Sequence, residues 1–355
     1  MRRRFDKIHH FVSYFDEKTG IYARSGVIVN GKETNQDPFM SSFPELLDVG
    51  IMGHCEHGLK GLCRKSGVQC YQSGGKTQQP NMSLADFREI LEQCHQDTYQ
   101  IALGGRGDPD MHENFEVILK MCRQYGVVPN FTTSGYGMTP EKAAICKKYC
   151  GAIAISWYRS PYTRQSIQEL LSAGVKTNIH YVLGQNSIDE AIRRLETLDF
   201  PVGINAVVFL LHKPVGFGTE ENVLQKDDSK VSEFFELVDT GNFPFKIGFD
   251  SCSVPGILHF CKRIAGESID TCEGGRWSAY ISPDMKMMPC SFDNSAMKWA
   301  VDLRTYTLQE AWDSPQFDDF RSRFLNSCPY CAKRENCMGG CPITPQIVLC
   351  GEKDL

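Results

Sequence analysis

The sequence has no long apolar segment. None of its hydrophobic runs approaches the roughly 20 residues that a helix needs to cross a lipid bilayer. Its basic start, MRRRFDKIHHFVSYF, also lacks the apolar core and the small-residue cleavage site of a secretory signal peptide. We therefore expect no membrane partner and a cytoplasmic location.

An excess of charge of one sign is also missing. The formal net charge of the 355 residues is −5, and 23% of them are charged, so nothing in the composition favours nucleic acid or another polyanion as a partner. The chain has no repeat of fixed period and no low-complexity tract. Its length suffices for about two domains that each bury a core.

Cysteine, by contrast, is abundant, with 16 residues. Because a cytoplasm keeps thiols reduced, these cysteines favour metal binding over structural disulfides. Three of them, Cys55, Cys63 and Cys70, lie in the Gly-rich stretch GHCEHGLKGLCRKSGVQCYQ, with gaps that fit no common zinc pattern. Nine of the 16 fall in the last third of the chain.

Between residues 45 and 250 predicted strands alternate with predicted helices. The predicted strands are residues 45–52, 99–105, 127–133, 152–158, 176–183, 204–211 and 245–249. Ser187 and Glu190 form a predicted capping box at the start of one helix. Repeated strand–helix units imply parallel strands that close partly or wholly into a barrel, with the active site at their carboxyl ends. Four further cysteines lie on the predicted helices and are expected to be buried core thiols: Cys94, Cys122, Cys146 and Cys150.

The two ends of the chain differ from this middle part. Residues 1–44 hold two β-prone runs around a Lys-Thr-Gly turn, which predicts a hairpin. After about residue 250 the alternation stops and the chain becomes rich in Cys, Gly and Pro. We therefore expect an N-terminal hairpin extension (1–44), a barrel (45–250) and a Cys-rich domain (251–355).

The Cys-rich part has seven cysteines in a regular order, namely Cys272, Cys290, Cys328, Cys331, Cys337, Cys341 and Cys350. Seven thiols exceed the four that one structural zinc takes, and [4Fe–4S] clusters also take four thiolates each. The run resembles a SPASM domain, the auxiliary-cluster module of radical S-adenosylmethionine (SAM) enzymes. One departure is Met285, which stands where the family pattern usually has Gly.

The resemblance implies two auxiliary [4Fe–4S] clusters. One would be held by Cys328, Cys331, Cys337 and Cys350. The other would be held by Cys272, Cys290 and Cys341. Its fourth ligand stays open between Cys252, which we prefer because it follows a predicted strand end, Cys261, and an iron left free for substrate.

The barrel resembles a radical SAM core, which implies a partial (β/α)6 TIM-like barrel. Its loop LGGRGDPDMH is similar to the family's Gly-Gly-Glu-Pro motif, and TTSGYG is similar to the turn after the third strand. The resemblance places these residues near SAM: Gly104, Gly105, Gly107, Asp108, Ser134, Ser156, Asn178, His180 and Val207. Singly, each is also typical of an ordinary turn or strand, and only their order at successive strand ends favours SAM.

The three-cysteine loop departs most from that family. The usual triad has gaps of three and two residues, so its outer cysteines are separated by six. Cys63 and Cys70 keep that separation, but Gly67 occupies the middle position. We expect Cys55 to supply the missing ligand and Tyr71 to match the aromatic residue that follows the third cysteine. A zinc site, or one cysteine that is simply a buried thiol, is the alternative.

The cofactors implied by the resemblance are SAM and three [4Fe–4S] clusters, one for SAM and two auxiliary. The reduced SAM cluster would generate a 5′-deoxyadenosyl radical, while the protein positions the substrate and excludes water and oxygen. We predict a maturase that forms a thioether or carbon–carbon crosslink in a ribosomally made precursor peptide. A flavodoxin or ferredoxin would be its reducing partner.

Other functions are less well supported by the residues. Sulfatase-maturing relatives carry an acidic residue directly after the cysteine that matches Cys290, whereas this chain has Ser291 there. Asp293, two positions further on, is the only catalytic candidate. Oxidation of a small alcohol or sugar is a second enzymatic alternative, which the full set of seven cysteines disfavours. An iron–sulfur electron carrier or a zinc-bound interaction protein is the non-enzymatic alternative.

Overall fold

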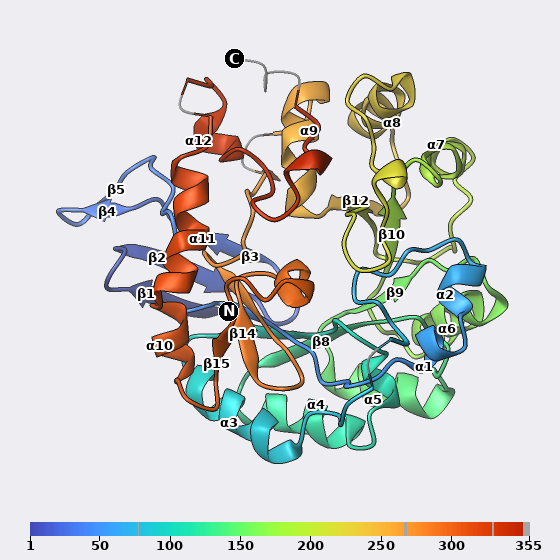
Figure 1. Ribbon diagram of the computed structural model, residues 1–355, viewed down its shortest axis with the longest axis horizontal. Coiled ribbons are helices and arrows are strands. Elements are labelled where there is room, and N and C mark those ends of the chain that lie inside the picture. Colours follow the sequence, from blue (N-terminus) through green and yellow to red (C-terminus); the bar gives the residue numbers. More distant parts are fainter. Residues whose placement is uncertain (77, 266–267, 329, 351–355) are drawn as a thin grey trace.

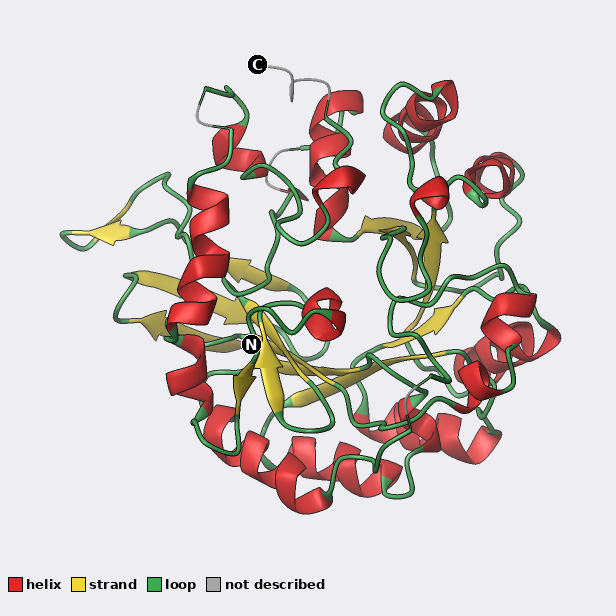
Figure 2. Cartoon of the chain, viewed as in Figure 1, coloured by secondary structure: helices red, strands yellow, loops and turns green. Residues whose placement is uncertain are grey.

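A ten-stranded sheet forms the centre of the molecule. The structure is a computed structural model that describes residues 1–76, 78–265, 268–328 and 330–350 (Figure 1). The strand order is β12-β11-β10-β9-β8-β7-β6-β13-β14-β15. All neighbours from β12 to β13 are parallel, and β14 and β15 are added antiparallel. Figure 2 shows the sheet curving, with helices along its outer side.

The parallel part is built from strand–helix units. Its strands are β6 (Leu46–Val49), β7 (Gln100–Leu103), β8 (Val128–Thr133), β9 (Ile153–Ser156), β10 (Thr177–Leu183), β11 (Ala206–Leu211) and β12 (Lys246–Phe249). The helices between them are α3 (Leu84–Cys94), α4 (Phe115–Gln124), α5 (Pro140–Tyr149), α6 (Pro161–Ser172), α7 (Ile188–Glu196) and α8 (Ser229–Thr240). Six such units followed by β12 confirm the predicted partial TIM-like barrel.

Side-chain alternation on the strands separates the barrel interior from the helix layer. In β10, Ile179, Tyr181 and Leu183 are fully buried in the main core, whereas the alternate Asn178 and His180 are only partly buried. Successive side chains of a strand point to opposite faces, so the second set faces the barrel interior. The polar residues of the strands therefore line the space inside the curved sheet.

Several barrel helices begin at a side chain that caps their first turn. Ser83, Thr139 and Ser160 accept hydrogen bonds from the N–H groups three residues ahead, at the starts of α3, α5 and α6. The predicted capping box at α7 is wrong. Ser187 Oγ donates instead to Val182 O at 2.8 Å, and the Glu190 carboxylate pairs with two arginines, because tertiary partners compete for both side chains.

The N-terminal part is a small sheet of its own. Its strands are β1 (Arg2–Asp6), β2 (Phe11–Phe15) and β3 (Tyr22–Arg24), all antiparallel. The β2–β3 hairpin confirms the predicted turn, and β1 is a third strand that the sequence analysis missed. A second hairpin follows, with β4 (Ile28–Val29) and β5 (Lys32–Glu33).

The C-terminal part joins the barrel sheet. Strand β13 (Ser278–Ile281) pairs with β6 in parallel, and β14 (Lys286–Met288) and β15 (Val301–Asp302) extend the sheet beyond it. Its helices are α9 (Val254–Phe260), α10 (Leu308–Trp312), α11 (Pro315–Leu325) and α12 (Arg334–Cys337). The change in composition near residue 250 therefore does not interrupt the sheet.

A salt bridge ties the two ends of the chain together. Arg24 on β3 binds both carboxylate oxygens of Asp270 at 2.7 and 2.9 Å, and its guanidinium lies 4.4 Å from the centre of the Trp277 ring. Figure 1 shows these two regions side by side. None of the helices in the described ranges is long and apolar enough to cross a membrane.

Candidate metal and cofactor centre

The loop after β6 is held by two short helices, α1 (Glu56–Leu59) and α2 (Leu62–Lys65). Cys55 caps α1, and its Sγ accepts a hydrogen bond from the N–H of Gly58 at 3.2 Å. Cys63 lies on α2 and is buried. Cys70 follows, and its carbonyl accepts a hydrogen bond from the N–H of Phe217 at 2.9 Å. The loop therefore sits at the carboxyl edge of the sheet.

The three thiols of this loop interact electrostatically. Burial, with smaller contributions from the charges of Asp108, Cys70 and Cys63, raises the pKa of Cys55 to about 12. A Cβ added at Gly74 would lie 3.4 Å from the Sγ of Cys55 and 3.6 Å from that of Cys70, so the backbone of Gly74 leaves room between them. A bound cation would reverse the electrostatic cost of three thiolates. The donor set fits an iron–sulfur cluster with three protein ligands.

Gly67, at the position where the family has its middle cysteine, lies on an exposed turn. It follows α2 with a φ of 72°, a conformation that favours glycine, and it is exposed. A Cβ there would meet no atom within 4 Å. A cysteine at this position would therefore face open space, whereas Cys55 faces Cys63 and Cys70.

The Gly-rich loop after β7 lies beside the cysteine loop. A Cβ at Gly107 would come within 2.4 Å of the His54 carbonyl oxygen, and one at Gly104 would meet no atom within 4 Å. Asp108 is buried, and its carboxylate accepts hydrogen bonds from Ser134 N at 2.7 Å and Ser134 Oγ at 2.6 Å. The structure thus brings together Asp108 and Ser134, two of the residues that the sequence assigns to SAM.

The other predicted SAM residues lie at different positions along the barrel strands. Ser156 ends β9 and is in register with His180 of β10, so both share the interior face. Asn178 is near the amino end of β10 and accepts a hydrogen bond from Asn205 Nδ2 at 2.7 Å. Val207 is fully buried in the helix-facing core. Their contacts with SAM stay predictions, which the placement of Asn178 and Val207 does not favour.

A polar cavity of about 360 Å³ occupies the amino end of the barrel. His180 and Asn178 line it together with residues of the N-terminal hairpin such as Phe15. Burial lowers the pKa of His180 to about 4, so its ring is neutral at physiological pH. This cavity lies at the opposite end of the strands from the cysteine loop.

Tyr71 connects the cysteine loop to the C-terminal part. Its ring lies 4.4 Å from that of Phe292, at an angle of 34° between the ring planes. Beside it, Gln72 Nε2 donates to Ser291 O at 3.3 Å, and Asn294 Nδ2 donates to Gln72 Oε1 at 2.7 Å. The segment that follows Cys70 therefore packs directly on the segment that follows Cys290.

Cys272, Cys290 and Cys341 form a second group of thiols. Burial, with a smaller contribution from the charge of Cys341, raises the pKa of Cys272 to about 12. The pKa of Cys290 is raised by burial and then by the charge of Cys272. A Cβ at Gly274 would lie 3.7 Å from the Sγ of Cys272 and 3.6 Å from the Cβ of Cys290. This group again leaves space between its sulfur atoms.

Cys252 belongs to this second group, whereas Cys261 does not. The thiols of Cys252 and Cys341 are hydrogen-bonded to each other, which lowers the pKa of Cys341 to about 6. Thr344 Oγ1 also donates to Cys341 Sγ, at 3.2 Å. Cys261 lies at the end of α9, with its sulfur 3.7 Å from the carbonyl oxygen of Phe235 in the helix layer.

A buried lysine stands next to the second group. Lys213 Nζ is 2.6 Å from Asp250 Oδ2, and its side chain is only 2% exposed. Burial opposes its charge, but Asp250, Cys252 and Cys341 raise the pKa of Lys213 above its usual range. The ammonium also lies 4.5 Å from the centre of the Phe292 ring. The ammonium therefore lies between Asp250, two residues before Cys252, and Phe292, two residues after Cys290.

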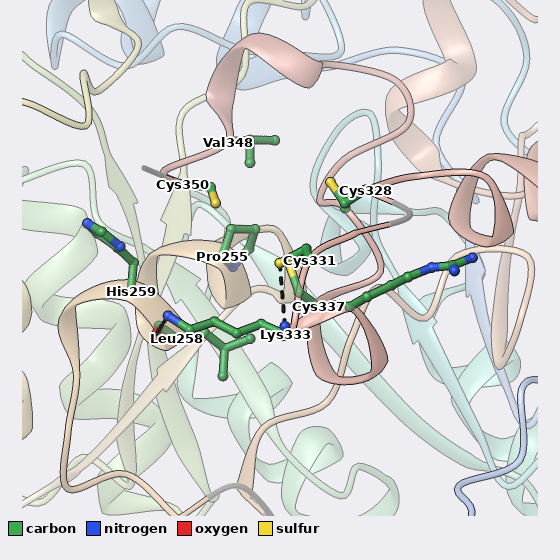
Figure 3. A pocket seen from close by; sticks show the side chains of 11 residues that line it. Pro255, Leu258, His259, Cys328, Cys331, Lys333, Cys337, Val348 and Cys350 are labelled. Atoms are coloured by element: carbon green, nitrogen blue, oxygen red, sulfur yellow. Dashed lines mark hydrogen bonds between the residues drawn. The ribbon is translucent and has the colours of Figure 1, made fainter. Parts of the chain in front are cut away.

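Cys328, Cys331, Cys337 and Cys350 surround one cavity, which Figure 3 shows. Burial raises the pKa of Cys337, and charges on Cys350, Cys328 and Cys331 raise it further. The backbone N–H of Lys333 donates to Cys331 Sγ at 3.4 Å. Four thiols around one cavity fit a [4Fe–4S] cluster.

Zinc and iron–sulfur sites differ in how far apart they hold their thiolates. Across the described ranges, no three His, Cys, Asp or Glu side chains are close enough together to hold a single metal ion. Four thiolates on one tetrahedral zinc lie only about 3.8 Å apart, whereas a [4Fe–4S] cube takes one thiolate at each iron. The choice of metal therefore rests on the number and type of donors in each group.

Three of the four cysteines on the barrel helices are buried in the core, as the sequence predicts, and the fourth is only partly buried. Cys94, Cys122 and Cys146 are fully buried in the core on α3, α4 and α5, and Cys150 is partly buried at the end of α5. All 16 cysteines lie in the described ranges, and none of them forms a disulfide. Met285 is buried in the turn before β14 with a φ of 63°, a conformation that suits the Gly of the family pattern.

Asp293, the catalytic candidate, is engaged in local structure. Its carboxylate accepts hydrogen bonds from the backbone N–H groups of Lys298 at 3.0 Å and Trp299 at 2.9 Å, and it is buried. Both oxygens are therefore occupied in holding a turn. This geometry does not favour a catalytic role for Asp293.

The sequence analysis missed three polar groups of the barrel sheet and its loops. Tyr280 Oη and Arg106 Nε are buried and have no hydrogen-bond partner among the described residues. Asp48 on β6 is in register with Tyr280, and burial raises the pKa of Asp48 to about 7. A charged residue within the apolar run ELLDVGIM was the signal that could have indicated Asp48.

A family model matches the C-terminal part of the chain, and solved structures are similar to most of it. The SPASM family, described as an iron–sulfur cluster-binding domain, matches residues 272–338. The crystal structure of Streptococcus suis SuiB bound to S-adenosylmethionine is similar, with a TM-score of 0.66 at 15% identity, covering 88% of this chain and 78% of that one. SuiB bound to its precursor peptide SuiA gives a TM-score of 0.65 at 16% identity, with coverages of 88% and 77%.

A second solved protein has the same fold. The histidine-tagged form of anSMEcpe with bound AdoMet has a TM-score of 0.59 at 14% identity, and the match covers 84% of this chain and 86% of that one. At these identities the likeness establishes the fold alone. Because it extends over most of each chain, the barrel and the C-terminal part both take part in it.

Proposed function

We propose that this chain, which has the fold of radical SAM enzymes with a SPASM domain, is a radical SAM enzyme that modifies a ribosomally made precursor peptide. The observation that carries the proposal is the gathering of 11 cysteines into three groups, two of which lie at the carboxyl edge of the barrel sheet. Each group has the three or four thiols that a [4Fe–4S] cluster needs.

The group at the β6 loop is proposed as the SAM site. Cys55, Cys63 and Cys70 would hold one cluster, and three protein ligands leave one iron for SAM. Bound together, the cluster and SAM would supply a 5′-deoxyadenosyl radical for hydrogen abstraction from carbon. Tyr71, which packs between this loop and the C-terminal part, would help to close the site to water.

The Gly-rich loop after β7 is the proposed cradle for the methionine part of SAM. Gly104 has open space where a side chain would stand, which supports a close approach of a ligand to the backbone. Gly105, Gly107 and Ser156 complete the proposed SAM contacts. Asp108 would act through Ser134, because its carboxylate is bonded to that residue.

The two other groups are the proposed auxiliary sites. Cys328, Cys331, Cys337 and Cys350 would hold one cluster. Cys272, Cys290, Cys341 and Cys252 would hold the other. Contact between the Cys252 and Cys341 thiols supports Cys252 as the fourth ligand over Cys261, whose sulfur lies beside Phe235.

A peptide substrate is supported by what similar structures bind. SuiB has been solved with its precursor peptide, and anSMEcpe with the Cp18Cys peptide. In this chain a thioether or carbon–carbon crosslink remains our proposed product, with a flavodoxin or ferredoxin as electron donor. Ser291 in place of an acidic residue after Cys290, and the occupied carboxylate of Asp293, weigh against sulfatase maturation.

The proposal is tested by SAM cleavage under anaerobic conditions. The reconstituted enzyme, given SAM and dithionite, should form 5′-deoxyadenosine, and the peptide encoded beside its gene should be converted to a crosslinked product detected by mass spectrometry. Cys55→Ala should abolish 5′-deoxyadenosine, because only two thiols remain at the SAM site. Cys261→Ala is the matched control and should retain it.

Two results would contradict this proposal. If the wild-type enzyme forms no 5′-deoxyadenosine even with that peptide present, it is not a radical SAM enzyme. If Cys55→Ala cleaves SAM as fast as the wild type, Cys55 is not a ligand and the assignment of the loop is wrong.

A further inference from the structure

A buried ion pair lies beside the proposed auxiliary site of Cys252, Cys272, Cys290 and Cys341. Lys213 follows β11 and Asp250 follows β12, and their side chains meet at 2.6 Å. Lys213 Nζ also donates to the carbonyl oxygen of Leu211 at 3.0 Å. On its other side the ammonium faces the ring of Phe292, 4.5 Å from the ring centre.

Burial makes a cation costly at this place. Removing an ammonium from water costs several kcal/mol, and a hydrophobic pair of similar volume is often as stable as a buried ion pair. The neighbours of the ammonium suggest another reason for it. Asp250, which it binds, lies two residues before Cys252, and Phe292, whose ring it faces, lies two residues after Cys290.

Charge around a cluster shifts its reduction potential. A reduced [4Fe–4S] cluster has one more negative charge than an oxidised one, so a fixed positive charge nearby favours the reduced form. Asp250 offsets part of this effect. Replacing Lys213 by a neutral residue would nevertheless leave this carboxylate alone beside the ligands, so the ammonium sets the more positive of the two charge states.

We propose that Lys213 raises the reduction potential of the cluster held by Cys252, Cys272, Cys290 and Cys341, so that this cluster accepts the electron released when the substrate is oxidised. The inference rests on the proposed function. A substrate C–H bond would give its hydrogen atom to the 5′-deoxyadenosyl radical. The resulting carbon radical would bond to a second substrate group, whose own bond to hydrogen breaks and gives its proton to solvent, and the one electron left over would go to this cluster. Lys213 acts through the cluster and is therefore a positioning residue.

The readout is the midpoint potential of this cluster in the full-length holoenzyme, measured by redox titration followed by electron paramagnetic resonance. The signal is assigned with Cys272→Ala, which should remove it. Lys213→Met should shift the equilibrium toward the oxidised cluster at least tenfold, a fall of about 59 mV for a one-electron couple. Lys213→Arg keeps the charge and should stay close to the wild type.

A matched control is Lys333, which lines the cavity of the other auxiliary site. Lys333→Met also removes a lysine charge, but it should leave unchanged the potential of the cluster held by Cys252, Cys272, Cys290 and Cys341. Asp250→Asn tests the sign. Because it removes the offsetting carboxylate and keeps the ammonium, the potential should rise, and this variant also serves if Lys213→Met does not fold.

The outcomes separate this inference from the proposed function. If the wild-type enzyme binds no iron at this site, the proposed function fails. If Lys213→Met binds the same iron as the wild type and its potential is unchanged, only the inference is wrong. An unchanged or lowered potential in Asp250→Asn would overturn the inference as well.

Discussion

Asp48 on β6 is a single residue whose carboxyl group has a strongly raised pKa. It is a half-buried carboxyl group on β6, on the opposite face of the strand from its sequence neighbours Leu47 and Val49, which are fully buried in the core. No hydrogen bond or ion pair holds it among the described residues, and burial raises its pKa from 3.8 to about 7. An acid that is kept neutral without a partner destabilises the fold once it ionises, which suggests a role toward a ligand.

This pKa predicts how stability depends on pH. Below about pH 4 Asp48 is protonated in both the folded and the unfolded chain and has no effect. Between about pH 4 and pH 7 the unfolded chain releases its proton first, so stability falls as the pH rises. Asp48→Asn removes the charge and should raise the free energy of unfolding at pH 8 by up to about 4 kcal/mol.

The measurement is thermal unfolding of both proteins at a series of pH values. The gain in Tm of the variant should be absent at pH 4 and should grow up to about pH 7. A gain that is the same at all pH values would show that the carboxyl charge is not the cause.

At the scale of elements, the strand ends decide where the chemistry can occur. The sequence predicts the seven strands from β6 to β12, because each is a compact run of apolar and β-prone residues between turn signals, but it does not predict the parallel strand β13. It fails at the start of α7, where the Glu190 side chain turns to Arg159 and Arg194. A capping pattern in the sequence predicts only hydrogen bonds between neighbouring residues. Residues distant in the chain can bind the same side chain instead.

The loop after β7 gives a prediction for one element. Gly104→Ala should leave stability unchanged, because the added methyl group meets no protein atom within 4 Å. The methyl group would occupy space proposed for SAM, so the affinity for SAM should fall at least tenfold.

The test compares SAM affinity, by equilibrium binding to cluster-loaded protein, with the Tm. Gly105→Ala is the contrasting variant, because its Cβ would lie 2.6 Å from Tyr280 Oη and the fold itself should be destabilised. If Gly104→Ala binds SAM as tightly as the wild type, the cradle is misassigned.

For the whole molecule, the barrel and the C-terminal part share one sheet. Strand β13 covers the edge of β6, and the salt bridge of Arg24 with Asp270 joins the N-terminal sheet to the same region. A strand edge without its partner is a site of aggregation. The barrel is therefore not expected to be an independent folding unit.

A fragment of residues 1–250 should accordingly be insoluble or lack a cooperative unfolding transition. The control is the full-length chain in which Cys328, Cys331, Cys337 and Cys350 are all changed to alanine. It loses an auxiliary site but keeps β13, and it should remain soluble. A monomeric fragment that unfolds cooperatively would disprove the shared-sheet argument.

The sequence by itself determined the number and grouping of the cysteines, the alternation of strands and helices, and the glycines after β7. These are local properties, set by residue type and spacing. Only the tertiary structure decided that Cys252 and not Cys261 lies beside Cys341, that β13 enters the barrel sheet, and that Lys213 pairs with Asp250. Such contacts join residues that are far apart in the chain, and packing of the whole fold determines them.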